Sequence, residues 1–130
     1  MFVADNKECY GIEGVPDKYF VQKVKTWEVK TNHYIHLPHQ NLGFITNPSF
    51  KTWTFTHQAR AEELVAKATS VKDLENILRD RKNADTKTAI CTIKEENKCC
   101  TYSAFIFDTK NKKAHYCQGN PQENEFKEYG

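Results

Sequence analysis

The sequence of 130 residues predicts an α+β fold in which an antiparallel β-sheet carries two helices packed on one face. Three observations lead to this expectation. Residues 1–30 alternate apolar and polar side chains, residues 56–82 place apolar side chains at helical spacing, and strand-like patterns resume after residue 86. The length suits a single domain over residues 1–130.

The first predicted strands form an antiparallel meander with one face in water. Turn-forming sequences, 5–7 (Asp-Asn-Lys) and 14–17 (Gly-Val-Pro-Asp), separate them. In the last strand Trp27 and Val29 alternate with charged residues. The predicted strands are FVAD (2–5), ECYGIEG (8–14), YFVQKVK (19–25) and TWEVKT (26–31).

Residues 31–55 are expected to be a long irregular segment, because Pro38, Gly43 and Pro48 interrupt it. Long loops of this kind often carry functional residues. A first helix is predicted to begin at Thr56, in THQARAEELVAKA, and a second at Ser70, in SVKDLENILRDRK. Ser70 and Asp73 resemble a weak capping box, which usually has Glu or Gln in the second position.

Three further strands are predicted after the helices, joined by polar turns at residues 94–98 and 109–112. They are KTAICTI (87–93), CCTYSAFIFD (99–108) and KKAHYCQG (112–119). The tail, NPQENEFKEYG (120–130), is predicted to wrap over the surface.

The composition argues against several classes of function. The formal charge is +2 and no basic tract occurs, so neither nucleic acid nor an anionic membrane is an expected partner. No apolar run reaches the length of a transmembrane helix. The five cysteines are odd in number and lack framework spacing, which favours a reduced chain and a cytoplasmic location.

The histidines of TNHYIHLPHQN raise the possibility of a metal site on His33, His36 and His39. Zinc sites need ligands that converge tetrahedrally, Pro38 opposes a helix that would align these rings, and no CxxC accompanies them. Histidines of a loop or of the edge of a site are therefore favoured, and no metal or cofactor is expected. A small histidine-rich metal-binding protein remains an alternative.

The candidate nucleophiles lack the local context of a catalytic site. None of the cysteines lies in a nucleophile signature, and Cys91 lies in an apolar segment typical of a core. Ser103, Asp108 and His115 do not form a credible triad, because no Gly-x-Ser-x-Gly elbow is present.

The ordered set of motifs nevertheless resembles a known family. FVADNKECYGIEGVPDKYFVQKVKTWEVKTNHY, then Arg60 in the first helix, SVKDLENILRD, TAIC, TYSAFIFD and HYCQGNP follow one another in register over nearly the whole chain. This order is similar to the C-terminal half of N-terminal-nucleophile amide hydrolases of the penicillin acyltransferase type. These belong with the linear amide C–N hydrolases, which include choloylglycine hydrolases and acid ceramidase.

The resemblance implies roles for four residues. In this family an N-terminal Cys attacks an amide carbonyl with its own α-amine as base, and an Asn at a strand end donates its side-chain amide to the oxyanion. Asn32 occupies the matching position. His33 and Tyr34 are implied to flank the acyl pocket. Arg60 is implied to be either a helix-start residue near the site or a structural ion-pair partner, and the structural role is favoured.

The chain also departs from the family. The nucleophile of such enzymes lies upstream of the matching region, and Phe2 follows Met1, so loss of the initiator Met exposes no Cys. Asp80-Arg81 and Thr92 stand where the family often has Asp-His and His. We therefore expect no turnover by the chain alone. Half of the family's four-layer sandwich leaves strand edges and an apolar sheet face exposed, which invites pairing.

Two interpretations follow from this comparison. In the first, a complementary N-terminal half supplies the nucleophile, and the reconstituted enzyme acts on a small-molecule amide or acyl substrate. In the second, the chain is a non-catalytic module that uses the same sheet to bind a partner or to form a homo-oligomer.

Overall fold

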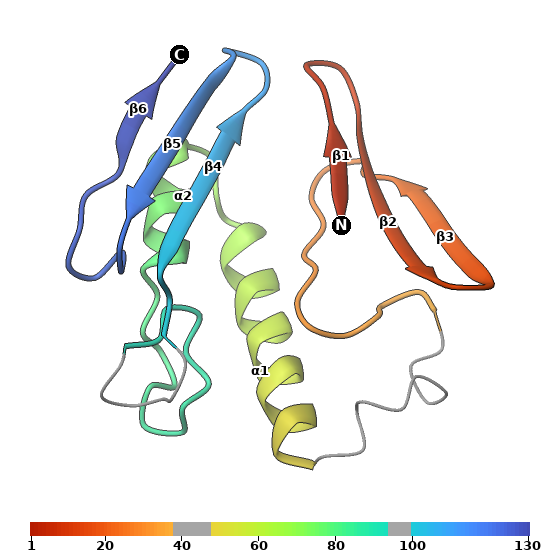
Figure 1. Cartoon of the computed structure of the whole chain (residues 1–130), viewed down its shortest axis with the longest axis horizontal. Coiled ribbons are helices and arrows are strands. Elements are labelled where there is room, and N and C mark those ends of the chain that lie inside the picture. The colour runs from red at the N-terminus through yellow and green to blue at the C-terminus, as the bar shows by residue number, and fades with distance from the viewer. Residues whose placement is uncertain (38–47, 94–99) are drawn as a thin grey trace.

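The computed structural model describes residues 1–37, 48–93 and 100–130, and it has the predicted α+β character (Figure 1). Over these residues the strands form two separate antiparallel sheets of three strands each, where the sequence analysis expected one sheet. Two helices lie between them in the chain. The elements are β1 (Phe2–Ala4), β2 (Cys9–Val15), β3 (Lys18–Lys23), α1 (Pro48–Val65), α2 (Val71–Leu78), β4 (Ser103–Asp108), β5 (Lys113–Gln118) and β6 (Lys127–Tyr129).

The first sheet has the order β1-β2-β3, with β2 at its centre. Phe2 pairs with Gly11, and Ile12 pairs with Val21. Successive side chains of a strand point to opposite faces, so Gly11 and Glu13 share one face of β2. Gly11 and Glu13 are the buried residues of this strand.

The prediction of a strand over residues 26–31 is wrong. This segment runs without ladder pairing. The carbonyl of Val29 accepts a hydrogen bond from Gln58 Nε2 of α1 at 2.9 Å, and the side chain of Lys30 is turned inward rather than into water.

Helix α1 begins at Pro48 rather than at Thr56, so the prediction of an irregular segment is wrong for residues 48–55. Residues 38–47 lie outside the described part of the chain. Proline suits the first turn of a helix because its missing N–H has no partner there. The ring of Trp53 lies 5.5 Å from that of Phe50 and 4.5 Å from that of His57, so aromatic neighbours three and four residues apart contact one another along this helix.

Helix α2 begins as predicted. Ser70 Oγ accepts a hydrogen bond from the backbone N–H of Asp73 at 3.1 Å, and the Asp73 carboxylate accepts one from the Ser70 N–H at 3.0 Å. This reciprocal pair is a capping box with Asp in place of Glu.

The second sheet has the order β4-β5-β6. The tail is not only a surface wrap, because Tyr129 pairs with Ala114 and Lys127 with Tyr116. The predicted strand over residues 87–93 does not form. Its backbone groups form hydrogen bonds outside any strand ladder. The N–H of Cys91 donates to Asp80 O at 3.0 Å, and Thr92 O accepts from Asn120 Nδ2 at 2.8 Å.

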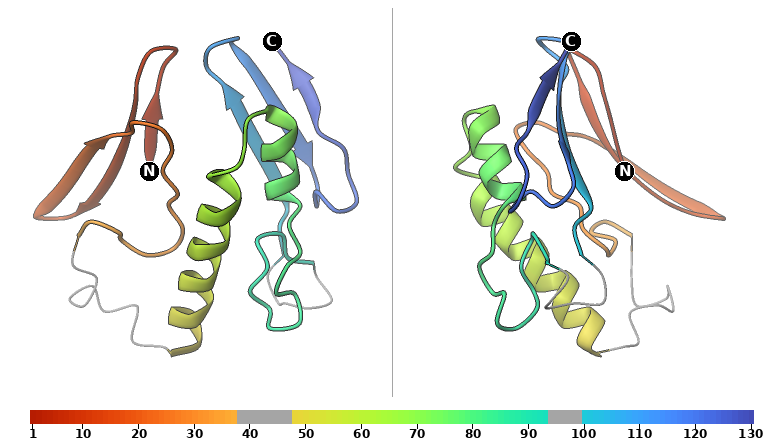
Figure 2. Two further views of the ribbon diagram at one scale, coloured as in Figure 1. Left: turned by 180° about the vertical axis from the view of Figure 1, so that it is seen from behind. Right: turned by 60° about the vertical axis from the view of Figure 1, so that its left-hand side comes forward.

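Helix α2 packs on one face of the second sheet, and α1 packs against α2. Viewed from behind, α2 stands in front of the second sheet and α1 lies beside it (Figure 2). Ala104, Ile106 and Cys117 are buried on the covered side. On the opposite face Phe105 is 53% exposed and Phe107 is 70% exposed. Over the described residues, no helix combines the length and the apolar character needed to cross a bilayer.

Candidate functional site

A cleft of about 500 Å³ lies between the first sheet and the segment that follows it. The segment over residues 30–34 forms one wall, and β2 forms the other. Its lining residues are Met1, Ile12, Glu13, Gly14, Lys30, Thr31, Asn32, His33 and Tyr34. The cleft therefore contains three of the four residues that the family resemblance selected.

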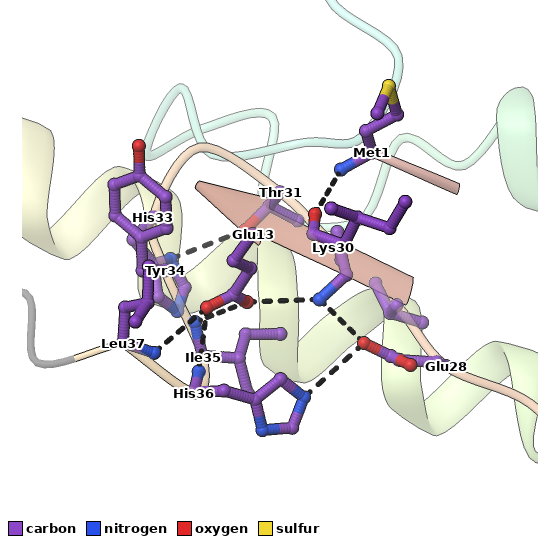
Figure 3. Close-up of polar contacts among 12 residues, drawn as sticks. Met1, Glu13, Glu28, Lys30, Thr31, His33, Tyr34, Ile35, His36 and Leu37 are labelled. Atoms are coloured by element: carbon purple, nitrogen blue, oxygen red, sulfur yellow. Dashed lines mark hydrogen bonds and ion pairs between the residues drawn. The ribbon is translucent and has the colours of Figure 1, made fainter. Parts of the chain in front are cut away.

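The carboxylate of Glu13 anchors the segment that carries these residues. Its Oε1 accepts the backbone N–H of Ile35 at 2.8 Å, and its Oε2 accepts those of His36 at 2.9 Å and Leu37 at 3.0 Å (Figure 3). Glu13 is only 5% exposed. Burial by itself raises the pKa of this carboxyl, but the N–H groups of Leu37 and Ile35, with Lys30, outweigh burial and lower the pKa to about 2.

Lys30 neutralises this buried carboxylate and links it to a second one. Its Nζ lies 3.0 Å from Glu13 Oε1 and 2.6 Å from Glu28 Oε1, and all three side chains are largely buried. Burial lowers the pKa of Lys30, but the bonds to Glu28 and Glu13 raise it by more. His36 continues the cluster, with Nε2 at 3.5 Å from Glu28 Oε1 and its ring stacked on Phe20 at 4.3 Å.

Helix α1 holds the same segment from the other side. Thr54 Oγ1 accepts the backbone N–H of Asn32 at 3.2 Å and lies 2.8 Å from His33 Nδ1. Thr31 Oγ1 donates to Gln58 Oε1 at 3.1 Å. Both Thr54 and Gln58 are buried, so the helix presents a polar face to this segment.

The predicted site residues occupy different environments. Asn32 is exposed on the cleft. His33 lines the cleft too, but its ring is buried and stacks on Phe55 at 4.3 Å. Tyr34 donates its hydroxyl to Gly14 O at 2.9 Å, across the cleft. These contacts place an amide, an imidazole and a phenol along one wall.

Arg60 lies outside the cleft. Its guanidinium binds Asp80 through two hydrogen bonds, with Nε to Oδ2 at 3.0 Å and Nη2 to Oδ1 at 2.6 Å, and it binds Glu63 at 2.7 Å. These carboxylates raise the pKa of Arg60, Asp80 more than Glu63. The geometry is that of an ion pair between α1 and the end of α2.

Sequence reasoning missed the residues that build the site, namely Glu13, Lys30, Thr54 and Gln58. One signal was present for the helical pair, because Thr54 and Gln58 are four residues apart and share a helix face. For Glu13, the signal was a carboxylate within an otherwise small or apolar strand.

The other candidate sites do not assemble in the described residues. Within them no three His, Cys, Asp or Glu side chains gather around a common point as metal ligands would, and His39 lies outside them. Asp108 accepts hydrogen bonds from Asn111 rather than from His115, which lies 3.8 Å from Glu128. Burial raises the pKa of the Cys91 and Cys117 thiols, which makes them poor nucleophiles.

Comparison with known proteins identifies no relative: no protein-family model, curated protein or solved structure matches the chain.

Proposed function

We propose that this chain is the oxyanion-stabilising part of an amide hydrolase or acyltransferase of the N-terminal-nucleophile type, acting on linear amide C–N bonds. The proposal rests on the resemblance to the penicillin acyltransferase type of enzyme. The observation that supports it is the placement of Asn32. Its side chain is exposed on the cleft, while the backbone is held by hydrogen bonds of the Asn32 N–H to Thr54 and of the Ile35 N–H to Glu13.

An asparagine in this position suits the chemistry of acyl transfer. Attack of a thiolate on an amide carbonyl generates a negatively charged oxygen, and a neutral side-chain NH₂ is a permanent donor to it. A donor held in place before the reaction requires no reorganisation as charge develops. The thiol belongs to a complementary segment, on another chain or elsewhere in a longer one.

The open face of the second sheet supports a partner of this kind. Phe105 stacks on Tyr116 at 4.3 Å and lies 6.1 Å from Phe107, which gives a flat aromatic surface. Exposed apolar surfaces of this kind mark protein interfaces. The same surface favours the second candidate, a non-catalytic module that self-associates or binds another protein.

A tagged form of the chain, purified from its source cells, separates these functions. We expect native mass spectrometry to find a co-purifying segment whose mature N-terminus is Cys, and we expect the complex, but not the chain alone, to cleave a chromogenic anilide. Asn32→Ala should lower turnover by about 10²–10³. A matched change at an exposed asparagine of α2, Asn76→Ala, should leave turnover unchanged. A homodimer without a Cys-bearing partner supports the second candidate instead.

A further inference from the structure

Asn32 lies on a segment without regular secondary structure, yet an oxyanion donor has to be held within about 0.5 Å of its working position. The segment therefore needs a rigid support. Figure 3 shows that its two ends converge on one side chain: Lys30 from before Asn32, and the backbone of Ile35 to Leu37 from after it, all bind the carboxylate of Glu13.

The hydrogen-bonding capacity of this carboxylate is fully used. Oε1 accepts from Lys30 Nζ and from the N–H of Ile35, and Oε2 accepts from the N–H groups of His36 and Leu37. A carboxylate offers about four acceptor sites and no donor. Three of these four partners are backbone groups, so the carboxylate fixes the path of the chain and not only a side chain.

We propose that Glu13 is the positioning residue for Asn32. This inference rests on the proposed function, because it assigns Glu13 a role in the same site. Glu13 closes residues 30–37 into a loop in which Asn32 lies between the two attachment points, and it belongs to β2, the central strand of the first sheet. The next residue of this strand, Gly14, accepts the hydroxyl of Tyr34 and adds a further tie. Glu13 acts through the backbone and does not itself contact a reacting atom.

The charge balance of the site fits this role. A bare carboxylate beside a developing oxyanion would oppose catalysis, but the three N–H dipoles and the ammonium of Lys30, which Glu13 shares with Glu28, offset the charge of Glu13. Glutamine cannot replace Glu13, because the side-chain NH₂ of glutamine would stand where a carboxylate oxygen now accepts two hydrogen bonds.

The test is the Glu13→Gln substitution in the chain, with Glu8→Gln as the matched control. Glu8 is an exposed carboxylate that binds the side chain of Lys23, a residue of the same sheet. NMR is expected to show amide exchange at Ile35, His36 and Leu37 at least tenfold faster in Glu13→Gln, with altered resonances of the Asn32 side-chain amide. Glu8→Gln is expected to change neither. Unchanged exchange in a folded Glu13→Gln chain overturns the proposal. If this variant does not fold, the shorter Glu13→Asp provides the same measurement.

The active complex supplies a second readout that a general loss of stability would not reproduce. Glu13→Gln should lower kcat at least tenfold with KM nearly constant, and it should lower turnover no further in an Asn32→Ala background. Full additivity of the two changes would show that Glu13 does not act through Asn32. If the wild-type complex has no turnover, the proposed function fails, while the exchange data still decide whether Glu13 fixes the segment.

Discussion

Arg60 of α1 binds Asp80, which lies two residues beyond the end of α2, through two parallel hydrogen bonds of 3.0 and 2.6 Å. Both side chains are largely buried at this junction. The backbone of Asp80 also accepts the N–H of Cys91, so the pair links both helices to the segment that precedes β4. The ion pair therefore holds α1 against α2, the helix that packs on the second sheet.

Replacement of Arg60 by Ala should lower the free energy of unfolding by about 2 kcal/mol, because it leaves the mostly buried carboxylate of Asp80 without its charged donors. Urea unfolding followed by circular dichroism measures this change. The control is Lys67→Ala, which removes an exposed partner of Glu63 and should cost less than about 1 kcal/mol. Equal effects of the two changes would contradict the structural role of Arg60.

Glu13 should make the stability of the chain depend on pH at the acid end. Its folded-state pKa of about 2 lies below the ordinary value of 4.5, so the stabilisation is fully present above pH 4.5 and disappears as the pH falls through about 2. A shift of this size corresponds to about 3 kcal/mol. Urea unfolding across this pH range should show the decline in the wild type and a flatter profile in Glu13→Gln. Parallel profiles would argue against a strongly stabilised carboxylate.

The capping box at the start of α2 should contribute measurably to the stability of that helix. Ser70→Ala removes the acceptor for the Asp73 N–H, and loss of such a cap costs about 1 kcal/mol. The urea midpoint is expected to shift accordingly. A change at an exposed position of the same helix, Lys72→Ala, should have little effect. If Ser70→Ala is as stable as the wild type, the reciprocal bonds do not persist in solution.

The contrast between local and long-range signals explains what the sequence could predict. The capping box is a property of four consecutive residues, so it was predicted and is confirmed. The strand expected over residues 26–31 was wrong because alternation does not show where backbone groups find partners, and the carbonyl of Val29 binds Gln58 from a distant helix. The strand predicted over residues 87–93 (KTAICTI) was wrong for the same reason, since the carbonyl of Thr92 binds the side chain of Asn120.

The candidate site shows the same division. The resemblance selected Asn32, and the structure places Asn32 on a cleft, but the local signal at Glu13, a carboxylate in a small or apolar strand, did not show that this side chain is buried. A charged residue between Ile12 and Gly14 is normally assigned to the wet face of a strand. Here that face is covered by residues 35–37, whose N–H groups require an acceptor, and this contact joins residues more than twenty positions apart.

The aromatic face of the second sheet should drive association with a partner. Phe105 and Phe107 are 53% and 70% exposed, so changing both to Ser removes apolar contact area at an interface while disturbing the fold little. We expect the double variant to weaken the native assembly, whether with a complementary segment or with a second copy, by at least tenfold in Kd. Sedimentation velocity over a concentration series measures this. Tyr102→Ser is the control, because Tyr102 is 80% exposed but precedes β4 and does not belong to the stacked group. An assembly that tolerates the double variant, or that responds equally to Tyr102→Ser, would place the interface on another surface, such as the free edge of β1 or of β4.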